Sequence, residues 1–227
     1  MALNLKTKVL TYFGLGQTTH DADLTTTGGY VPVANALTAF REPDGIALFK
    51  IDDEDDDEDN KNGGRRDARS AEDEDEDEDD DDDIEYFVTA DEGDTANAAG
   101  SSGPRGGRTV SVFNAKTGAF VGDTGNQLDA AAAAANVYPD SRSNRGGSEP
   151  EVLDVTKHKG RILVAVGLER AASVALVDVT IPSTPNVIGL APTGNNPEGV
   201  KFFRTKGKLY ILTANEASGT VSAVRVD

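Results

Sequence analysis

The sequence predicts an all-β fold, a β-propeller-like array of about three four-stranded antiparallel blades that form an incomplete ring. Outside one acidic run, Val, Ala, Gly and Thr dominate the composition, which favours sheet over helix. A unit that begins with Pro and an acidic residue also recurs. Pro150 and Pro197 are 47 residues apart, as are Glu169 and Glu216. A repeat of about 40–50 residues has the length of one propeller blade.

The last copy of the unit, in residues 197–227, is the easiest to follow. Three apolar runs at 199–203, 209–214 and 220–226 are joined by the basic turn RTKGK and by the small-residue turn ASG. Strands that alternate with short turns form an antiparallel meander. The sequence therefore predicts one blade in residues 197–227.

The second copy occupies residues 150–191. Strands are expected at 150–155, 162–167 and 173–179, and the basic turn KHKGR joins the first two. A fourth strand is expected at 186–191, after the segment IPSTP, whose two prolines suit a loop or an edge.

The first copy, approximately 43–122, contains two insertions. Strands are expected at 45–51, 86–90, 109–114 and 119–122. The propeller-like domain thus spans 40–227. Residues 1–39 form an N-terminal segment that could supply strands of a preceding blade: we expect one or two strands in 3–13, a polar loop in 18–29, and a strand with a short helical turn in 30–40.

The acidic insertion, residues 52–83, carries almost the whole charge of the chain. It holds 21 acidic and four basic residues, −17 of the total −18. Because like charges repel and bury no apolar area, we expect this low-complexity segment to be disordered. It could gather Ca²⁺ weakly through many carboxylates, bind basic protein surfaces, or be a tolerated, solubilising insertion.

A tighter acidic group, Asp91, Glu92 and Asp94, follows a predicted strand and is the candidate metal site. It could ligate one Ca²⁺ or shape the turn. In the other copies only the glutamates recur, as Glu169 and Glu216, which favours a structural role such as capping backbone donors or pairing with an arginine.

Other polar residues have ordinary interpretations. His20 lies beside two aspartates, but a solvated loop histidine is expected; His158 lies in a basic turn. Residues 127–135 predict a short helix with Asp129 as N-cap. Arg142 and Arg145 could hold an anion, but exposed, solubilising charges are expected.

Several kinds of site are missing from the sequence. The chain has no cysteine, no G-x-S-x-G motif and no phosphate-binding glycine loop. It also lacks a basic, aromatic-rich face for nucleic acid and any apolar run long enough to span a membrane. No catalytic residue is assigned, and we expect a non-enzymatic protein. The alternatives are a Ca²⁺-dependent phosphoester hydrolase that uses blade-end carboxylates, and a protein-interaction scaffold.

Several segments resemble the choice-of-anchor I family, which is similar to mesenchyme-specific cell-surface glycoproteins. The most specific segments are VTADEGD at 88–94, DSRS at 140–143, GLERA at 167–171 and TANEASGTV at 213–221. The resemblance covers roughly residues 40–227. It implies an extracellular or surface-attached β-propeller, and it identifies no catalytic residue.

The sequence departs from that family in its acidic insertion, in a shortened segment at 95–108 and in its blade number, since a closed ring needs about 4–8 blades. Open blade edges favour self-association. The first residues lack the continuous apolar region of a signal peptide. The chain is therefore expected to be either intracellular or a piece of a longer protein, whereas the resemblance implies an extracellular or cell-surface location.

Overall fold

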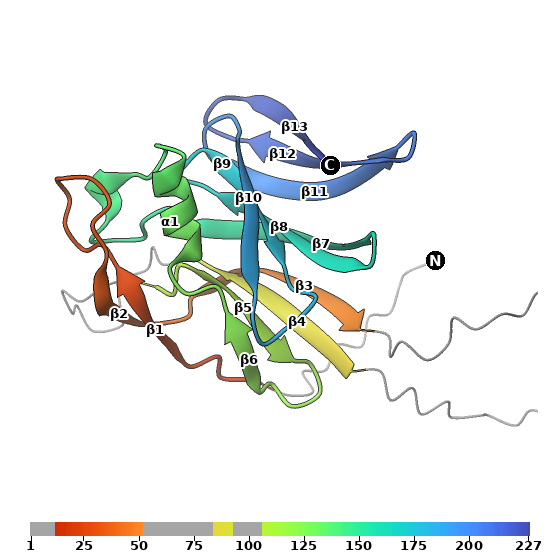
Figure 1. Ribbon diagram of the computed structural model, residues 1–227, viewed down its shortest axis with the longest axis horizontal. Coiled ribbons are helices and arrows are strands. Elements are labelled where there is room, and N and C mark those ends of the chain that lie inside the picture. Colours follow the sequence, from red (N-terminus) through yellow and green to blue (C-terminus); the bar gives the residue numbers. More distant parts are fainter. Residues whose placement is uncertain (1–11, 52–83, 93–105) are drawn as a thin grey trace, which may run out of the picture.

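The computed structural model describes residues 12–51, 84–92 and 106–227 (Figure 1). These residues form four antiparallel sheets of two to four strands and one α-helix, and no closed barrel. The prediction of an all-β fold with incomplete, propeller-like blades is confirmed. The acidic insertion, for which disorder was predicted, lies outside the described residues.

The first blade is a four-stranded sheet in the order β3-β4-β5-β6. Its strands are β3 (Pro43–Ile51), β4 (Ile84–Asp91), β5 (Thr109–Asn114) and β6 (Phe120–Asp123). Strands β3 and β4 pair from Pro43 opposite Asp91 to Ile51 opposite Ile84, so the acidic insertion joins the ends of a paired hairpin.

The second and third blades repeat this arrangement. The second contains β7 (Pro150–His158), β8 (Arg161–Leu168), β9 (Ser173–Asp178) and β10 (Asn186–Pro192). The third contains β11 (Pro197–Thr205), β12 (Lys208–Asn215) and β13 (Thr220–Val226). This blade has three strands, as predicted for residues 197–227, and no described strand pairs with the outer edge of β13.

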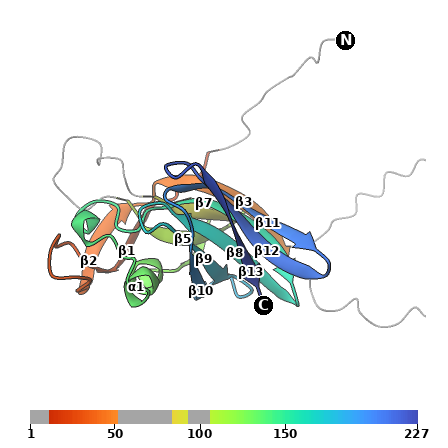
Figure 2. The same cartoon turned by 90° about the horizontal axis from the view of Figure 1, so that it is seen from above.

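The first strands of the three blades, β3, β7 and β11, lie next to one another (Figures 1 and 2). The sheets therefore pack against each other through their faces, as blades do. One core lies between the first and second blades, and a smaller one between the second and third. The first core contains Val88, Val110, Val112, Val164, Val166 and Val177; the second contains Ala165, Val174, Val200 and Ile211.

The N-terminal segment adds a separate two-stranded sheet of β1 (Gln17–Ala22) and β2 (Val33–Phe40). The polar loop predicted at 18–29 is wrong for 18–22, which lie in β1, but no strand occurs at 23–29. The strand predicted in 30–40 is present as β2, without the helical turn. The polar residues of β1 alternate between exposed and buried, and the buried ones find partners: Thr18 Oγ1 donates to Asp123 Oδ2 at 2.9 Å. Hydrogen bonds of these buried polar side chains therefore supply the stabilisation that an apolar strand would gain from burial. The strands expected in 3–13 lie almost entirely outside the described residues.

His20 is buried, and not the solvated loop residue that was predicted. Its Nε2 lies 2.9 Å from the Gly107 carbonyl oxygen and its Nδ1 lies 2.8 Å from that of Asp21. The first contact links β1 to the segment that leads into β5. His20 is therefore a tertiary contact between the N-terminal sheet and the first blade.

The helix α1 (Gln127–Ala134) connects the first two blades. Asn126 occupies its N-cap, so the assignment of Asp129 to that position is wrong. Asp129 is buried in the first turn instead, where it accepts a hydrogen bond from the Ser148 amide at 3.0 Å and lies 3.7 Å from Arg108 Nη1. Leu128 and Ala132 enter the first core. Tertiary packing thus stabilises a helix that would be marginal alone.

Candidate functional site

The repeated Pro and Glu residues occupy equivalent places in all three blades. Pro43, Pro150 and Pro197 each pair with the residue that precedes the recurrent glutamate. The amide of that glutamate donates to the carbonyl oxygen of the residue before the proline, at 2.9, 2.9 and 2.8 Å for Glu92, Glu169 and Glu216. The same main-chain bond therefore brings a carboxylate to the start of the first strand in every blade.

Two of these carboxylates meet a third, from the residue after Pro150, between the first and second blades. Glu92, Glu151 and Glu169 each offer an oxygen, and these three atoms all lie within 4.8 Å of one another. Glu169 is 5% exposed, and Glu92 and Glu151 are half-buried. We call this group the inner carboxylates.

The inner carboxylates are placed where negative charge is unfavourable. Burial, and after it the nearby carboxylates of Glu198, Glu92 and Asp44, raise the pKa of Glu151 to about 7 against the opposing effect of Arg170. Burial also raises the pKa of Glu169; Arg170 opposes this, and Glu151 and Glu149 add to it. Arg170 therefore opposes the raised pKa of both glutamates, whereas neighbouring carboxylates add to it.

The third blade extends the group. Its two equivalent residues, Glu198 and Glu216, are joined by a side-chain hydrogen bond that raises the pKa of Glu198. Asp44, from the first blade, adds to the negative charge at both Glu151 and Glu198. Six carboxylates thus belong to one end of the three hairpins, which we call the acidic end: Asp44, Glu92, Glu151, Glu169, Glu198 and Glu216.

Arg170 is the main described cation beside this end. Its Nε lies 2.7 Å from Glu149 Oε2, and its Nη1 lies 2.8 Å from Glu169 Oε1. Glu149 is fully buried and also pairs with Arg142. The prediction that Arg142 is an exposed, solubilising charge is therefore wrong, whereas the Arg145 side chain is exposed as predicted. The family segments DSRS and GLERA meet through Glu149.

The predicted metal ligands Asp91, Glu92 and Asp94 have different surroundings. Glu92 belongs to the inner carboxylates. Asp91 is fully buried, and its carboxylate accepts hydrogen bonds from Thr89, Thr109 and Ser111 at 2.6 to 2.8 Å. Asp94 lies outside the described residues. The structure therefore brings Glu92 together with glutamates of the second blade.

Glu151 and Glu169 were not among the predicted metal ligands. Glu151 was noted only as the acidic residue of the Pro-acidic pair, and Glu169, after the second strand, was interpreted as structural. Part of that interpretation holds, because Glu169 pairs with Arg170 and accepts from Asn196 Nδ2 at 2.7 Å. What could have revealed the group is the side-by-side packing of blades, since equivalent positions in adjacent blades then become neighbours.

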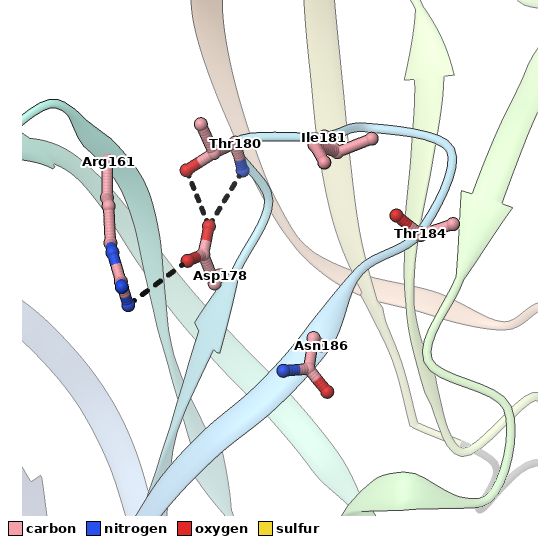
Figure 3. Close-up of a pocket in the computed structure, with 6 residues that line it drawn as sticks. All are labelled: Arg161, Asp178, Thr180, Ile181, Thr184 and Asn186. Atoms are coloured by element: carbon pink, nitrogen blue, oxygen red, sulfur yellow. Dashed lines mark hydrogen bonds and ion pairs between the residues drawn. The ribbon is translucent and has the colours of Figure 1, made fainter.

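A pocket on the second blade is separate from the acidic end (Figure 3). It has a volume of about 390 Å³ and is lined by Arg161, Asp178, Thr180, Ile181, Thr184 and Asn186. Asp178 Oδ1 accepts from the Thr180 amide and hydroxyl at 2.9 and 2.5 Å, and its Oδ2 lies 3.5 Å from Arg161 Nη1. Asp178 is the one acidic residue that lines this pocket, and its carboxylate holds the loop after β9.

Comparison with known proteins gives one family match. Residues 103–182 match the choice-of-anchor I domain, a stretch that runs from before β5 to beyond β9 and contains Glu151 and Glu169. No curated protein matches the chain. Within the described residues, none of the helical segments has the length and apolar character needed to cross a membrane. The match supports, for residues 103–182, the choice-of-anchor I resemblance predicted from the sequence, and it suggests a surface-associated, non-enzymatic domain.

Proposed function

We propose that this chain is a surface-associated, non-enzymatic propeller-like protein that binds Ca²⁺ at its acidic end. The observation that carries the proposal is the approach of Glu92, Glu151 and Glu169 to within 4.8 Å. Oxygen ligands lie about 2.3–2.6 Å from Ca²⁺, so two ligands of one ion are at most about 5 Å apart. The spacing of the inner carboxylates fits one shared cation.

The surroundings of Glu151 support a cation more than an empty cluster. Its Oε2 is buried and makes no hydrogen bond among the described residues. A buried charged oxygen without a partner costs free energy, which a bound cation would offset. A divalent ion would also remove the repulsion that raises the pKa of Glu151.

The acidic insertion is a second proposed source of Ca²⁺ ligands. Its 21 acidic residues and the absence of a defined loop motif favour weak binding of several ions. The acidic end, in contrast, presents ligands from two packed blades, so a single ion should bind there with fixed stoichiometry. The two sources can therefore be separated by experiment.

Isothermal titration calorimetry with Ca²⁺ tests the proposal on four proteins: the native chain, Glu92→Gln/Glu151→Gln, a chain without residues 52–83, and the control Glu85→Gln. Glu85 is exposed and pairs with Lys50, far along β4 from the acidic end. We expect the double variant to lose a one-ion site, with affinity weaker by at least about tenfold, or about 1.4 kcal/mol. Deletion should remove only the weak, multi-ion uptake.

Equal Ca²⁺ uptake by the native chain and the double variant would contradict a site at the acidic end. Equal uptake with and without residues 52–83 would contradict the role of the insertion. Ca²⁺-dependent hydrolysis of a phosphate ester by the native chain, lost in Glu92→Gln/Glu151→Gln, would contradict the non-enzymatic part of the proposal and favour a hydrolase.

A further inference from the structure

The end of the blades opposite the acidic end is basic. The tips of the β7–β8 and β11–β12 hairpins, residues 157–161 and 204–208, contain six cationic residues and no acidic residue. All six are exposed. We call them the basic turns: Lys157, Lys159, Arg161, Arg204, Lys206 and Lys208.

The two basic turns form one surface. Arg204, at the end of β11, donates to the Lys157 carbonyl oxygen, and its Nη1 lies 3.0 Å from His158 Nδ1. Desolvation, and after it the positive charges of Arg204 and Lys159, lower the pKa of His158. The charges of the two turns are therefore close enough to act on the same residue. Two acidic residues border this surface. Asp178 lies 3.5 Å from Arg161, and Asp227 pairs with Arg225. The basic turns remain in net positive excess.

The equivalent turn of the first blade is the place where the acidic insertion enters. Strand β3 ends at Ile51 and β4 begins at Ile84, opposite each other in the sheet, as His158 and Arg161 are in the second blade. Figure 1 shows these ends of β3 and β4 on the same side of the molecule as the hairpin tips of β7–β8 and β11–β12. The acidic segment is therefore attached on the same side of the described blades as the basic turns.

We propose that the basic turns are a docking surface for the chain's own acidic segment, residues 52–83. The charges are complementary, −17 on the segment against six cations on the turns. Attachment at both ends gives the segment an effective concentration of the order of mM at a neighbouring turn, so weak contacts suffice. Interactions between exposed charges are screened beyond about 10 Å at 0.1 M salt, so the contact should be sensitive to ionic strength.

Paramagnetic relaxation enhancement tests this contact in the full chain. Because the protein has no cysteine, Ser70→Cys gives a single attachment point for a spin label. We expect broadening of the amide signals of residues 157–161 and 204–208 at about 0.01 M salt. The broadening should be lost at about 1 M salt, where the Debye length has fallen from about 30 Å to about 3 Å.

Two variants of equal charge change separate this surface from general electrostatics. In the labelled Lys159→Glu/Lys206→Glu protein the broadening of the turns should disappear. In the labelled control Lys116→Glu/Arg145→Glu it should persist, because both control residues are exposed and lie outside the basic turns. Native-like amide spectra of both variants would establish that the blades are folded.

Absence of broadening at low salt, or equal broadening in the two variants, would overturn the proposal. A mixture of isotope-labelled native chain with unlabelled, spin-labelled chain detects contact between molecules. Broadening confined to that mixture would assign the docking to a second copy and overturn the intramolecular proposal.

Discussion

Among single residues, Asp91 shows how the first blade holds a buried charge. Burial raises the pKa of Asp91, whereas hydrogen bonds from the Ser111, Thr109 and Thr89 hydroxyls and the charge of Arg41 lower it. Arg41 Nε lies 4.0 Å from Asp91 Oδ2 and donates to Ser111 Oγ at 3.0 Å. Asp91 is thus the acceptor on which a set of buried donors depends.

We expect Asp91→Ala to lower the free energy of unfolding by about 3 kcal/mol, because it leaves three buried hydroxyls without their acceptor and removes one of the two carboxylates near Arg41. Asp44→Ala, at an exposed position on β3, should change it by less than about 0.5 kcal/mol. Urea unfolding followed by circular dichroism measures both. Similar losses for the two variants would refute a buried network around Asp91.

At the scale of elements, the close approach of blades depends on a glycine in the strand β3. A Cβ at Gly45 would lie 2.8 Å from the Glu151 carbonyl oxygen and 3.0 Å from the Leu153 amide nitrogen. A Cβ at Gly167 of β8 would likewise lie 2.7 Å from the Pro197 carbonyl oxygen of β11. Backbone contacts of this kind cannot give way as a side chain can, so each glycine sets the spacing of two sheets.

Gly45→Ala should therefore destabilise the fold by about 1–3 kcal/mol through overpacking, and it should also weaken Ca²⁺ binding because Glu151 would move. Gly189→Ala in β10 is the matched control, since its Cβ would meet only Leu176 Cβ at 4.0 Å. Thermal unfolding and calorimetry with Ca²⁺ provide the two measurements. If Gly45→Ala changed neither the melting temperature nor the Ca²⁺ affinity, Gly45 would not set the distance between the blades.

The repeat made the blades predictable from the sequence, because the same spacing of Pro and Glu marks the hairpin in the second and third blades, and the first blade has the same residues on either side of the acidic insertion. The strand β1 was missed, since its buried residues include Thr18 and His20, whose partners lie about 90 to 105 residues away. The inner carboxylates were missed for the same reason. Glu92, Glu151 and Glu169 become neighbours only when blades pack, and no local pattern expresses that packing.

For the whole molecule, charge is divided between the two ends of the hairpins. The acidic end contributes a pH dependence, because the folded pKa of Glu151, about 7, is above its ordinary value of 4.5. The folded state then holds its proton more tightly than the unfolded state. This contribution is favourable at low pH and is lost as pH rises through about 7.

Glu151→Gln removes that titration. We expect its melting temperature to exceed that of the native chain by about 2–4 °C at pH 8 after allowance for solvent screening, and the difference to vanish near pH 5. Saturating Ca²⁺ at pH 8 should stabilise the native chain more than the variant, and so reduce the difference between their melting temperatures. Melting curves across this range check both. A difference that is independent of pH would rule out Glu151 as the titrating group.

Each first strand runs nine residues from a carboxylate position to a turn region, as β7 does from Pro150 to His158. At about 3.3 Å per residue, the opposite charges are held roughly 30 Å apart on a rigid support. The second and third blades are consequently an electric dipole with a fixed axis. The acidic insertion is attached at the positive pole of this dipole, so its 17 net negative charges oppose the field of the blades.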